Sequence, residues 1–299
     1  MSFRNGLSTI VVATDLKGHS EAALEYARKL AGAYGARIVL AYGEDPVDYA
    51  AVEAIPGRVR KELSSHARAQ LDQLAGELVR EGIHSHTEIG QGEVARMLVD
   101  VARQYQAGLI VMGTRGKEGA GPVVIGAIAE QLVRLAPCPV LAVAADWNAG
   151  PFRPTPGGPI LLAMENNEAA SAAVATAYSL AENFDRPLLV LHARTAAETV
   201  AFLNPRATTP EQFGIPKDGR VQVKVLVKDG APADAVTQAI AQFHPSILVV
   251  GVKRTSDTHG PHGTAFALLA CSRVPVLCVP PEIAPSIPVS ERPASMVAG

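Results

Sequence analysis

The sequence predicts an α/β fold made of two tandem doubly wound units, each with a five-stranded parallel sheet between helices. Three observations support this prediction. Short apolar runs rich in Ile and Val, such as Thr9–Asp15, lack polar alternation, which is typical of parallel strands buried on both faces. Segments with apolar residues at helical spacing follow these runs, so strand and helix alternate. The whole pattern then returns about 150 residues later.

The first half is expected to contain five strands and four helices in strict alternation. The first helix should end at Gly35 and the second at Gly82, because glycine readily takes the left-handed conformation that ends many helices. The expected strands are Thr9–Asp15, Arg37–Tyr42, Ile83–Ile89, Leu109–Met112 and Pro139–Val143, and the expected helices are Ser20–Tyr34, Pro56–Glu81, Glu93–Tyr105 and Ala127–Leu135.

The second half repeats the first in the same order, which indicates an internal duplication. Ile160–Glu165 repeats Ile10–Asp15, with an acidic residue at the same position. The predicted organisation is a first domain over residues 1–146, a Pro- and Gly-rich linker over 147–158, a second domain over 159–280 and a Pro-rich tail over 281–299. The other repeated segments are Ala169–Glu182, Leu188–His192, Ile247–Gly251 and Val274–Val279.

Net charge, the length of apolar runs and the number of cysteines indicate which partners and which cellular compartment to expect. The formal net charge of −2 does not favour nucleic acid or an anionic membrane surface as a partner. No apolar run reaches the roughly 18 residues that a membrane-spanning helix requires. Three cysteines are too few for a disulfide framework, and we interpret them as small buried apolar residues. A cytoplasmic protein is therefore the expectation.

A glycine-rich stretch follows the fourth expected strand. Gly113 and Gly116 are separated by two residues, and Gly126 opens the next helix after nine more. Such glycines let the backbone approach a phosphate, and the first N–H groups of the helix point toward it. Glycines also end many strands without any ligand. The spacing alone leaves both readings open.

The whole pattern resembles the universal stress protein family. The resemblance rests on the glycine spacing, on Asp15 at the end of the first strand, and on the Cys-Pro-Val-Leu strand that begins at Cys138. It covers residues 7–145 and, more loosely, 159–280, so the chain resembles a tandem member with two family domains. The resemblance implies an adenine nucleotide alpha hydrolase-like, Rossmann-like sandwich. It also implies that the edge strands Pro139–Val143 and Pro275–Val279 meet near a pseudo-two-fold axis.

Many members of that family bind ATP, and the resemblance carries a nucleotide site onto the first half. Asp15 would accept hydrogen bonds from the ribose hydroxyls, and Tyr42 would offer backbone groups to the adenine. The N–H groups at the start of the helix after Gly126 would meet the phosphates. The implied site residues are Ala13, Thr14, Asp15, Tyr42, Met112, Gly113, Arg115, Gly116, Gly126, Ala127 and Ile128.

Two departures from the family pattern bear on affinity. Ala127 stands where the family has Ser or Thr, so one hydroxyl that would meet a phosphate oxygen is missing. The loss of a hydrogen bond to a charged group is worth about 1.5–3 kcal/mol. The second half departs further, with Glu165 in place of Asp15 and Arg254 in place of Gly116, although Thr264 restores the hydroxyl. We expect a degenerate site there.

Other candidate sites are weaker. Asp257, His259 and His262 form a partial set of zinc ligands in one loop, without an evident fourth ligand. His84 and His86 share one face of a strand and are expected at the surface. No nucleophile elbow, Walker lysine or catalytic carboxylate pair is present in the sequence.

We therefore expect a regulatory stress protein that binds ATP or another adenine nucleotide and is not an enzyme. Its partners would be the nucleotide, with Mg²⁺ accompanying ATP as an open alternative, and an unidentified protein. The two domains would pair within the chain, and a homodimer is a further alternative. Two other functions remain open: an interaction module that has lost nucleotide binding, and a slow ATP hydrolase.

Overall fold

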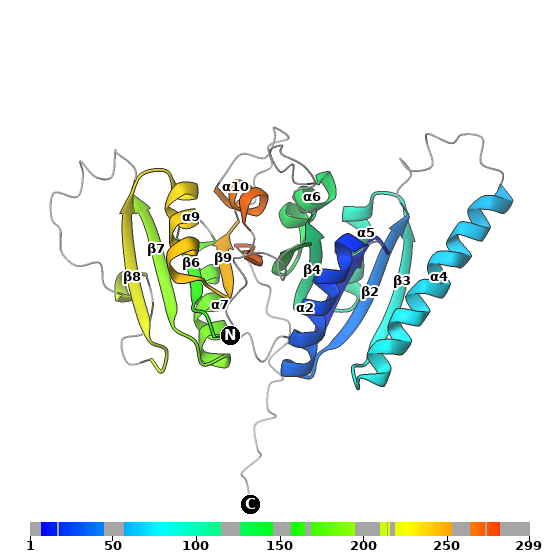
Figure 1. Cartoon of the computed structure of the whole chain (residues 1–299). Coiled ribbons are helices and arrows are strands. Elements are labelled where there is room, and N and C mark those ends of the chain that lie inside the picture. The colour runs from blue at the N-terminus through cyan, green and yellow to red at the C-terminus, as the bar shows by residue number, and fades with distance from the viewer. Residues whose placement is uncertain are drawn as a thin grey trace, which may run out of the picture.

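The computed structural model describes residues 7–16, 18–44, 57–114, 126–145, 157–164, 169–194, 210–213, 215, 219–252, 264–272 and 274–281. Within these ranges strands and helices alternate in both halves of the chain, as predicted (Figure 1). Most of the predicted linker and tail, and residues 115–125 of the glycine-rich stretch, lie outside the described residues. No helix within the described ranges combines the length and apolar character that crossing a membrane requires.

The elements follow the predicted order. In the first half they are β1 (Thr9–Thr14), α2 (Gly18–Tyr34), β2 (Arg37–Glu44), α4 (Gly57–Arg80), β3 (Ser85–Gln91), α5 (Val94–Gln104), β4 (Leu109–Thr114), α6 (Ala127–Leu135) and β5 (Val140–Ala144). In the second half they are β6 (Ile160–Met164), α7 (Ala170–Asn183), β7 (Leu188–Arg194), η1 (Pro210–Phe213), β8 (Val223–Asp229), α9 (Pro232–Phe243), β9 (Ile247–Gly251), α10 (Thr264–Cys271) and β10 (Val276–Val279).

Two strand starts in the first half differ from the sequence prediction for local reasons. β3 begins at Ser85 rather than Ile83, because the Ile83 N–H bonds to the Leu78 carbonyl at 2.9 Å and closes the end of α4. β5 begins at Val140 rather than Pro139. Proline has no N–H to donate, but the Pro139 carbonyl still accepts from the Ile110 N–H at 3.0 Å.

One ten-stranded sheet joins the two halves, in the order β3-β2-β1-β4-β5-β10-β9-β6-β7-β8. All neighbouring strands within each half are parallel, whereas β5 and β10 pair antiparallel. Leu141 and Leu277 lie directly opposite each other in that pair. The predicted meeting of the two final strands is confirmed. This pairing covers two apolar strand edges, which would promote aggregation if they were exposed.

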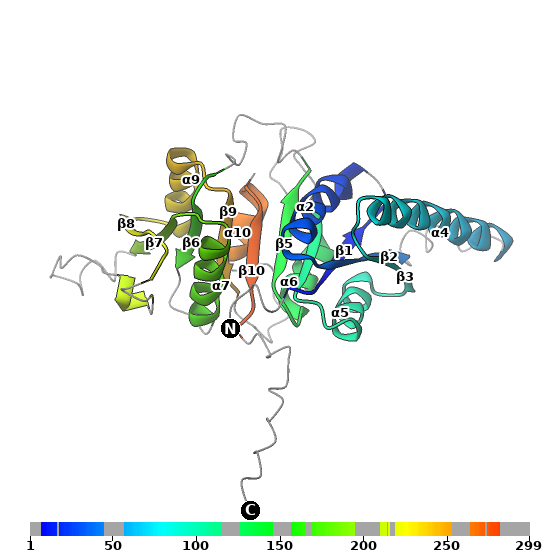
Figure 2. The ribbon, with the colours of Figure 1, turned by 90° about the horizontal axis from the view of Figure 1, so that it is seen from below.

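Each face of the sheet carries its own hydrophobic core, and both cores run through both halves. One core is formed with α2, α4 and α7, and the other with α5, α6, α9 and α10. Figure 2 shows helices on both sides of the sheet and the two halves side by side at β5 and β10. Near the junction the rings of Tyr34 and Phe184 meet edge to face, with centroids 5.7 Å apart. Both aromatic residues also pack against the core.

Several helices end on a residue in the left-handed conformation. Gly35 has φ of 67° and Gly82 has φ of 82°, which confirms their predicted role as helix ends. At the end of α5 the same geometry falls on Gln106, with φ of 49°, and the Ala107 N–H bonds to the Ala102 carbonyl at 2.8 Å. A side chain at such a position costs about 1–2 kcal/mol that glycine avoids.

Leu277 gives a test of the shared core, because it is 1% exposed at the junction of the halves. We expect Leu277→Ala to lower the free energy of unfolding by about 2–5 kcal/mol. We also expect both halves to unfold in one cooperative transition, since their cores are continuous. Urea denaturation followed by circular dichroism measures both effects. Val79→Ala, at a side chain that is 59% exposed, is the matched control. Two separate transitions would contradict the shared core.

Gln106 gives a test of the helix end. Gln106→Gly should raise the free energy of unfolding by about 0.5–1 kcal/mol, because glycine removes the left-handed strain but loses more conformational entropy on folding, and the backbone bond of the helix end is kept. Gly35→Ala should lower it by a similar amount. Thermal and urea unfolding of both variants measure the effects. A loss of stability in Gln106→Gly would show that the Gln side chain contributes more than its conformation costs.

Candidate functional site

The carboxyl ends of β1 and β4 form the switch point of the sheet in the first half. The chain passes from β1 to β2 on one side, and returns after β3 and α5 to add β4 on the other side of β1. The connections that follow β1 and β4 therefore leave in opposite directions. Open parallel sheets bind their ligands at such a point. We call the ends of β1, β2 and β4, with the first turns of α2 and α6, the switch-point site.

The structure brings the predicted residues of three neighbouring strands together at this site. Ala13 pairs with Met112, and Thr14 pairs with Tyr42. Met112 is 4% exposed and packs in the core, so this position offers its main chain rather than its side chain to a ligand. Gly113 follows it in β4. Tyr42 is partly buried and packs on the other face of the sheet.

Asp15 is exposed at the end of β1, and the first turn of α2 holds its carboxylate. The Ser20 hydroxyl donates to Asp15 Oδ1 at 2.7 Å, and the hydroxyls of Ser20 and Thr14 are 3.0 Å apart. Leu16 lies between β1 and α2 with φ of 55°, a left-handed conformation that is uncommon for leucine. This tight turn places the start of α2 over the end of β1.

The amino end of α6 lies at the same edge of the sheet. Because α6 connects the parallel neighbours β4 and β5, it runs antiparallel to them and begins at their carboxyl ends. Gly126 caps the helix without a side-chain hydrogen bond, and a Cβ there would meet no atom of the described residues within 4 Å. Ala127 and Ile128 are exposed. The first turn of α6 can therefore receive an anion on its N–H groups.

Several predicted site residues lie outside the described residues. These are Arg115 and Gly116 of the glycine-rich stretch, the second-half residues Glu165 and Arg254, and the partial zinc set Asp257, His259 and His262. Their predicted roles stay predictions. Among the residues that the structure describes, no group of three His, Cys, Asp or Glu side chains could hold a metal ion.

Sequence reasoning missed two polar residues near the site. Ser20 is 7% exposed and anchors Asp15, and the only sequence signal is a hydroxyl five residues after the acidic residue. Glu44 is 5% exposed at the end of β2, which extends two residues beyond the predicted Tyr42. Its carboxylate accepts from the Ser64 hydroxyl of α4 and from Gln91 Nε2 of β3 at 3.1 Å. Glu44 thus ties three elements together beside Tyr42.

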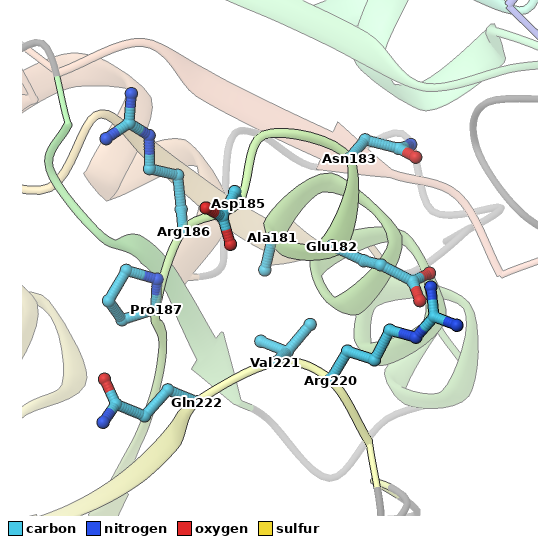
Figure 3. Close-up of a pocket in the computed structure, with 9 residues that line it drawn as sticks. All are labelled: Ala181, Glu182, Asn183, Asp185, Arg186, Pro187, Arg220, Val221 and Gln222. Carbon is cyan, nitrogen blue, oxygen red and sulfur yellow. The ribbon is translucent and has the colours of Figure 1, made fainter.

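A polar pocket of about 530 Å³ lies elsewhere, in the second half (Figure 3). It sits at the amino ends of β7 and β8, away from the switch-point site. Acidic and basic side chains both line it, and in Figure 3 Arg220 lies beside Glu182 while Arg186 points away from them. In the first half the last turns of α4 pack against the corresponding region, with Leu78 fully buried. The pocket lacks the switch-point geometry, so we do not assign the nucleotide to it.

The remaining predicted groups behave as ordinary structural residues. Burial raises the pKa of the Cys138 and Cys278 thiols to about 12, so both stay protonated near neutral pH. This confirms their interpretation as buried apolar residues. His84 and His86 are exposed at the β3 edge of the sheet, as predicted. His86 Nε2 lies 3.6 Å from Glu88 Oε1, and that oxygen also accepts from the Tyr105 hydroxyl at 2.6 Å.

The fold and the site define a Rossmann-like α/β protein whose two halves share one architecture. The model of the universal stress protein family matches residues 6–144 and 158–280. The chain therefore belongs to the universal stress protein family, which confirms the resemblance seen in the sequence. The matched segments contain all ten strands of the sheet.

Individual relatives agree with this assignment. A universal stress protein of Methanocaldococcus jannaschii is 33% identical over 148 residues, which cover 47% of this chain and 85% of that protein. One of Mycolicibacterium smegmatis is 26% identical over 215 residues, covering 69% of this chain and 70% of that protein. The solved structure of a universal stress protein from Archaeoglobus fulgidus matches with a TM-score of 0.74 at 17% identity, over 92% of this chain and 99% of that one. This last likeness supports the fold.

Proposed function

We propose that the chain binds an adenine nucleotide, ATP or AMP, at the switch-point site and acts as a cytoplasmic regulatory stress protein. The observation that carries the proposal is the position of Asp15, which is exposed at the end of β1 and held there by Ser20. In dinucleotide-binding α/β sheets an Asp or Glu carboxylate accepts a hydrogen bond from a ribose hydroxyl, and Asp15 offers such a group at the switch point. The open amino end of α6 supplies N–H groups for the phosphates.

The residues of the site fit this ligand. Met112 and Gly113 bring main-chain groups to the sheet edge, and Tyr42 borders it on the neighbouring strand. None of the described residues comes within 4 Å of where a Cβ on Gly126 would lie, so they leave room for a phosphate to approach the backbone there. In the proposal, Arg115 adds positive charge and Gly116 allows a close approach of the loop. The phosphates of ATP would bring Mg²⁺ with them.

A regulatory role suits the chemistry of the site better than catalysis. Phosphoryl transfer needs groups that hold the metal and position a nucleophile. The one exposed carboxylate that we assign to the site, Asp15, has the role of a sugar acceptor. In this proposal any hydrolysis of bound ATP is slow, and occupancy of the site is what a partner protein reads.

The second candidate function is an interaction module that binds no nucleotide. Ala127 favours it, because the hydroxyl that would meet a phosphate is absent from the first turn of α6. Mass spectrometry of the purified, denatured protein distinguishes the two functions by detecting co-purified adenine nucleotide. Isothermal titration with ATP then gives the affinity and the number of sites. Our proposal expects one site per chain.

Asp15 gives the first test of the site. Asp15→Ala should abolish ATP binding in isothermal titration, because it removes the acceptor for the ribose hydroxyls. Gly116→Arg should also abolish it by placing a side chain where the phosphates would lie. Glu165→Ala, at the corresponding position of the second half, is the matched control and should leave binding unchanged. Two equivalent sites per chain, or full affinity in both first-half variants, would refute the assignment.

Ala127 gives a gain-of-function test. Ala127→Ser should strengthen ATP binding by about 1–2 kcal/mol, because the new hydroxyl would donate to a phosphate oxygen. Ala127 is exposed in the first turn of α6, so the extra oxygen has room. Adenosine has no phosphate, and its affinity should not change. An equal gain for adenosine would mean that the phosphates lie elsewhere, and no gain for either ligand would favour the interaction module.

A further inference from the structure

The contacts around Asp15 form a chain of hydrogen bonds with a defined direction. A serine hydroxyl has one proton, and Ser20 donates it to Asp15 Oδ1 at 2.7 Å. In the 3.0 Å contact between Ser20 and Thr14, the Thr14 hydroxyl must therefore be the donor. Thr14 Oγ1 in turn accepts from the Leu16 N–H at 3.0 Å. The chain runs from Leu16 through Thr14 and Ser20 to Asp15, and we call it the Thr14–Ser20–Asp15 relay.

Burial makes the relay a fixed support rather than a surface contact. Ser20 is 7% exposed, Thr14 is partly buried, and only Asp15 at the end is exposed. Hydrogen bonds that point the same way along a chain polarise and strengthen one another in a poorly hydrated environment. Ser20 thus fixes one oxygen of Asp15, and the exposed carboxylate still has acceptor capacity for a ligand.

The backbone of Leu16 is strained in the conformation that the relay requires. A left-handed leucine is unfavourable, and residues held in this way are concentrated at functional sites. With φ of 55°, Leu16 turns its N–H toward the Thr14 hydroxyl and brings the start of α2 back over β1. Its side chain packs against the core and helps to hold the turn.

The second half has lost the relay as a unit. The repeat aligns Ala13 with Ala163, which is unchanged, whereas Thr14 becomes Met164 and Ser20 becomes Ala170. Met164 ends β6 and Ala170 begins α7, so both occupy the corresponding places in the fold. Neither side chain has a hydroxyl. At the acidic position itself, Glu165 replaces Asp15. The halves therefore keep the strands and differ in the support of the carboxylate.

We infer that Ser20 is a positioning residue that holds the Asp15 carboxylate for the sugar hydroxyls of a bound nucleotide. The relay then gives the first half its selectivity for a nucleotide with an intact ribose. This inference rests on the function proposed above. It adds that the hydrogen bond from Ser20 to Asp15 serves the recognition of the ribose. The second half, without the relay, has no such selectivity.

The test compares ATP with 2′,3′-dideoxy-ATP in isothermal titrations of the full chain. Ser20→Ala should weaken ATP binding about tenfold and dideoxy-ATP binding by less than about twofold, because the dideoxy sugar has no hydroxyl for Asp15 to accept from. Thr14→Val breaks the relay one step earlier and should shift the ratio in the same direction. Thr14→Ser keeps the hydroxyl and should retain the wild-type ratio. Ser179→Ala removes a serine of the second half that is 5% exposed, and is the matched control.

A double variant separates positioning from general damage. In an Asp15→Asn background, where the amide oxygen still accepts and ATP binding is weakened rather than abolished, Ser20→Ala should cost much less ATP affinity than it does alone, since the carboxylate that it positions is gone. Equal losses for ATP and dideoxy-ATP in Ser20→Ala, or an unchanged ratio in both relay variants, would overturn the inference while leaving the proposed function intact. If the wild-type chain binds no ATP at all, the proposed function fails and the inference fails with it.

Discussion

The antiparallel pairing of β5 with β10 is the contact on which the rest of the structure depends. A parallel sheet is normally buried on both faces, and the final strands β5 and β10 are apolar and buried along their whole length. The two strands would leave such edges exposed if the halves were apart. Their pairing merges two sheets into one of ten strands and makes both hydrophobic cores continuous. Two ring contacts flank this junction. Tyr34 packs against Phe184 on one face of the sheet, and on the other face Arg134 Cζ lies 5.0 Å from the centroid of the Phe266 ring.

The two halves share their strands and differ in the helices and side chains that surround them. The first half keeps a long helix, α4, on its outer strands, and α4 reaches Glu44 near the switch-point site through Ser64. The second half has a polar pocket in the region that corresponds to the end of α4. The first half also keeps the hydroxyls that support Asp15. This second difference concerns side chains alone, because the strands that define the switch-point site are present in both halves.

Most of the fold could be predicted from the sequence, because burial on both faces leaves an unambiguous pattern of apolar runs. The first-half elements differ from the prediction only at their ends, for example where Pro139 has no N–H and Ile83 closes a helix. In the second half, β8 and α9 were not predicted as individual elements. The strand-end residues of the site were named through the family resemblance, and they lie together because the carboxyl ends of the neighbouring strands β1, β2 and β4 meet at one edge. Ser20 was not, because its contact with Asp15 depends on a left-handed Leu16, and leucine gives no signal for that conformation.

The covalent link between the halves changes what their junction can be. In a homodimer a position on the two-fold axis faces its own copy, so complementary unlike residues cannot meet there. Here the equivalent positions Tyr34 and Phe184 differ and still pack together. Tethering also keeps the partner at an effective concentration of order millimolar for a flexible linker. The two halves therefore stay paired on dilution. A residue on one side of the junction can also be substituted without the same substitution appearing on the other side.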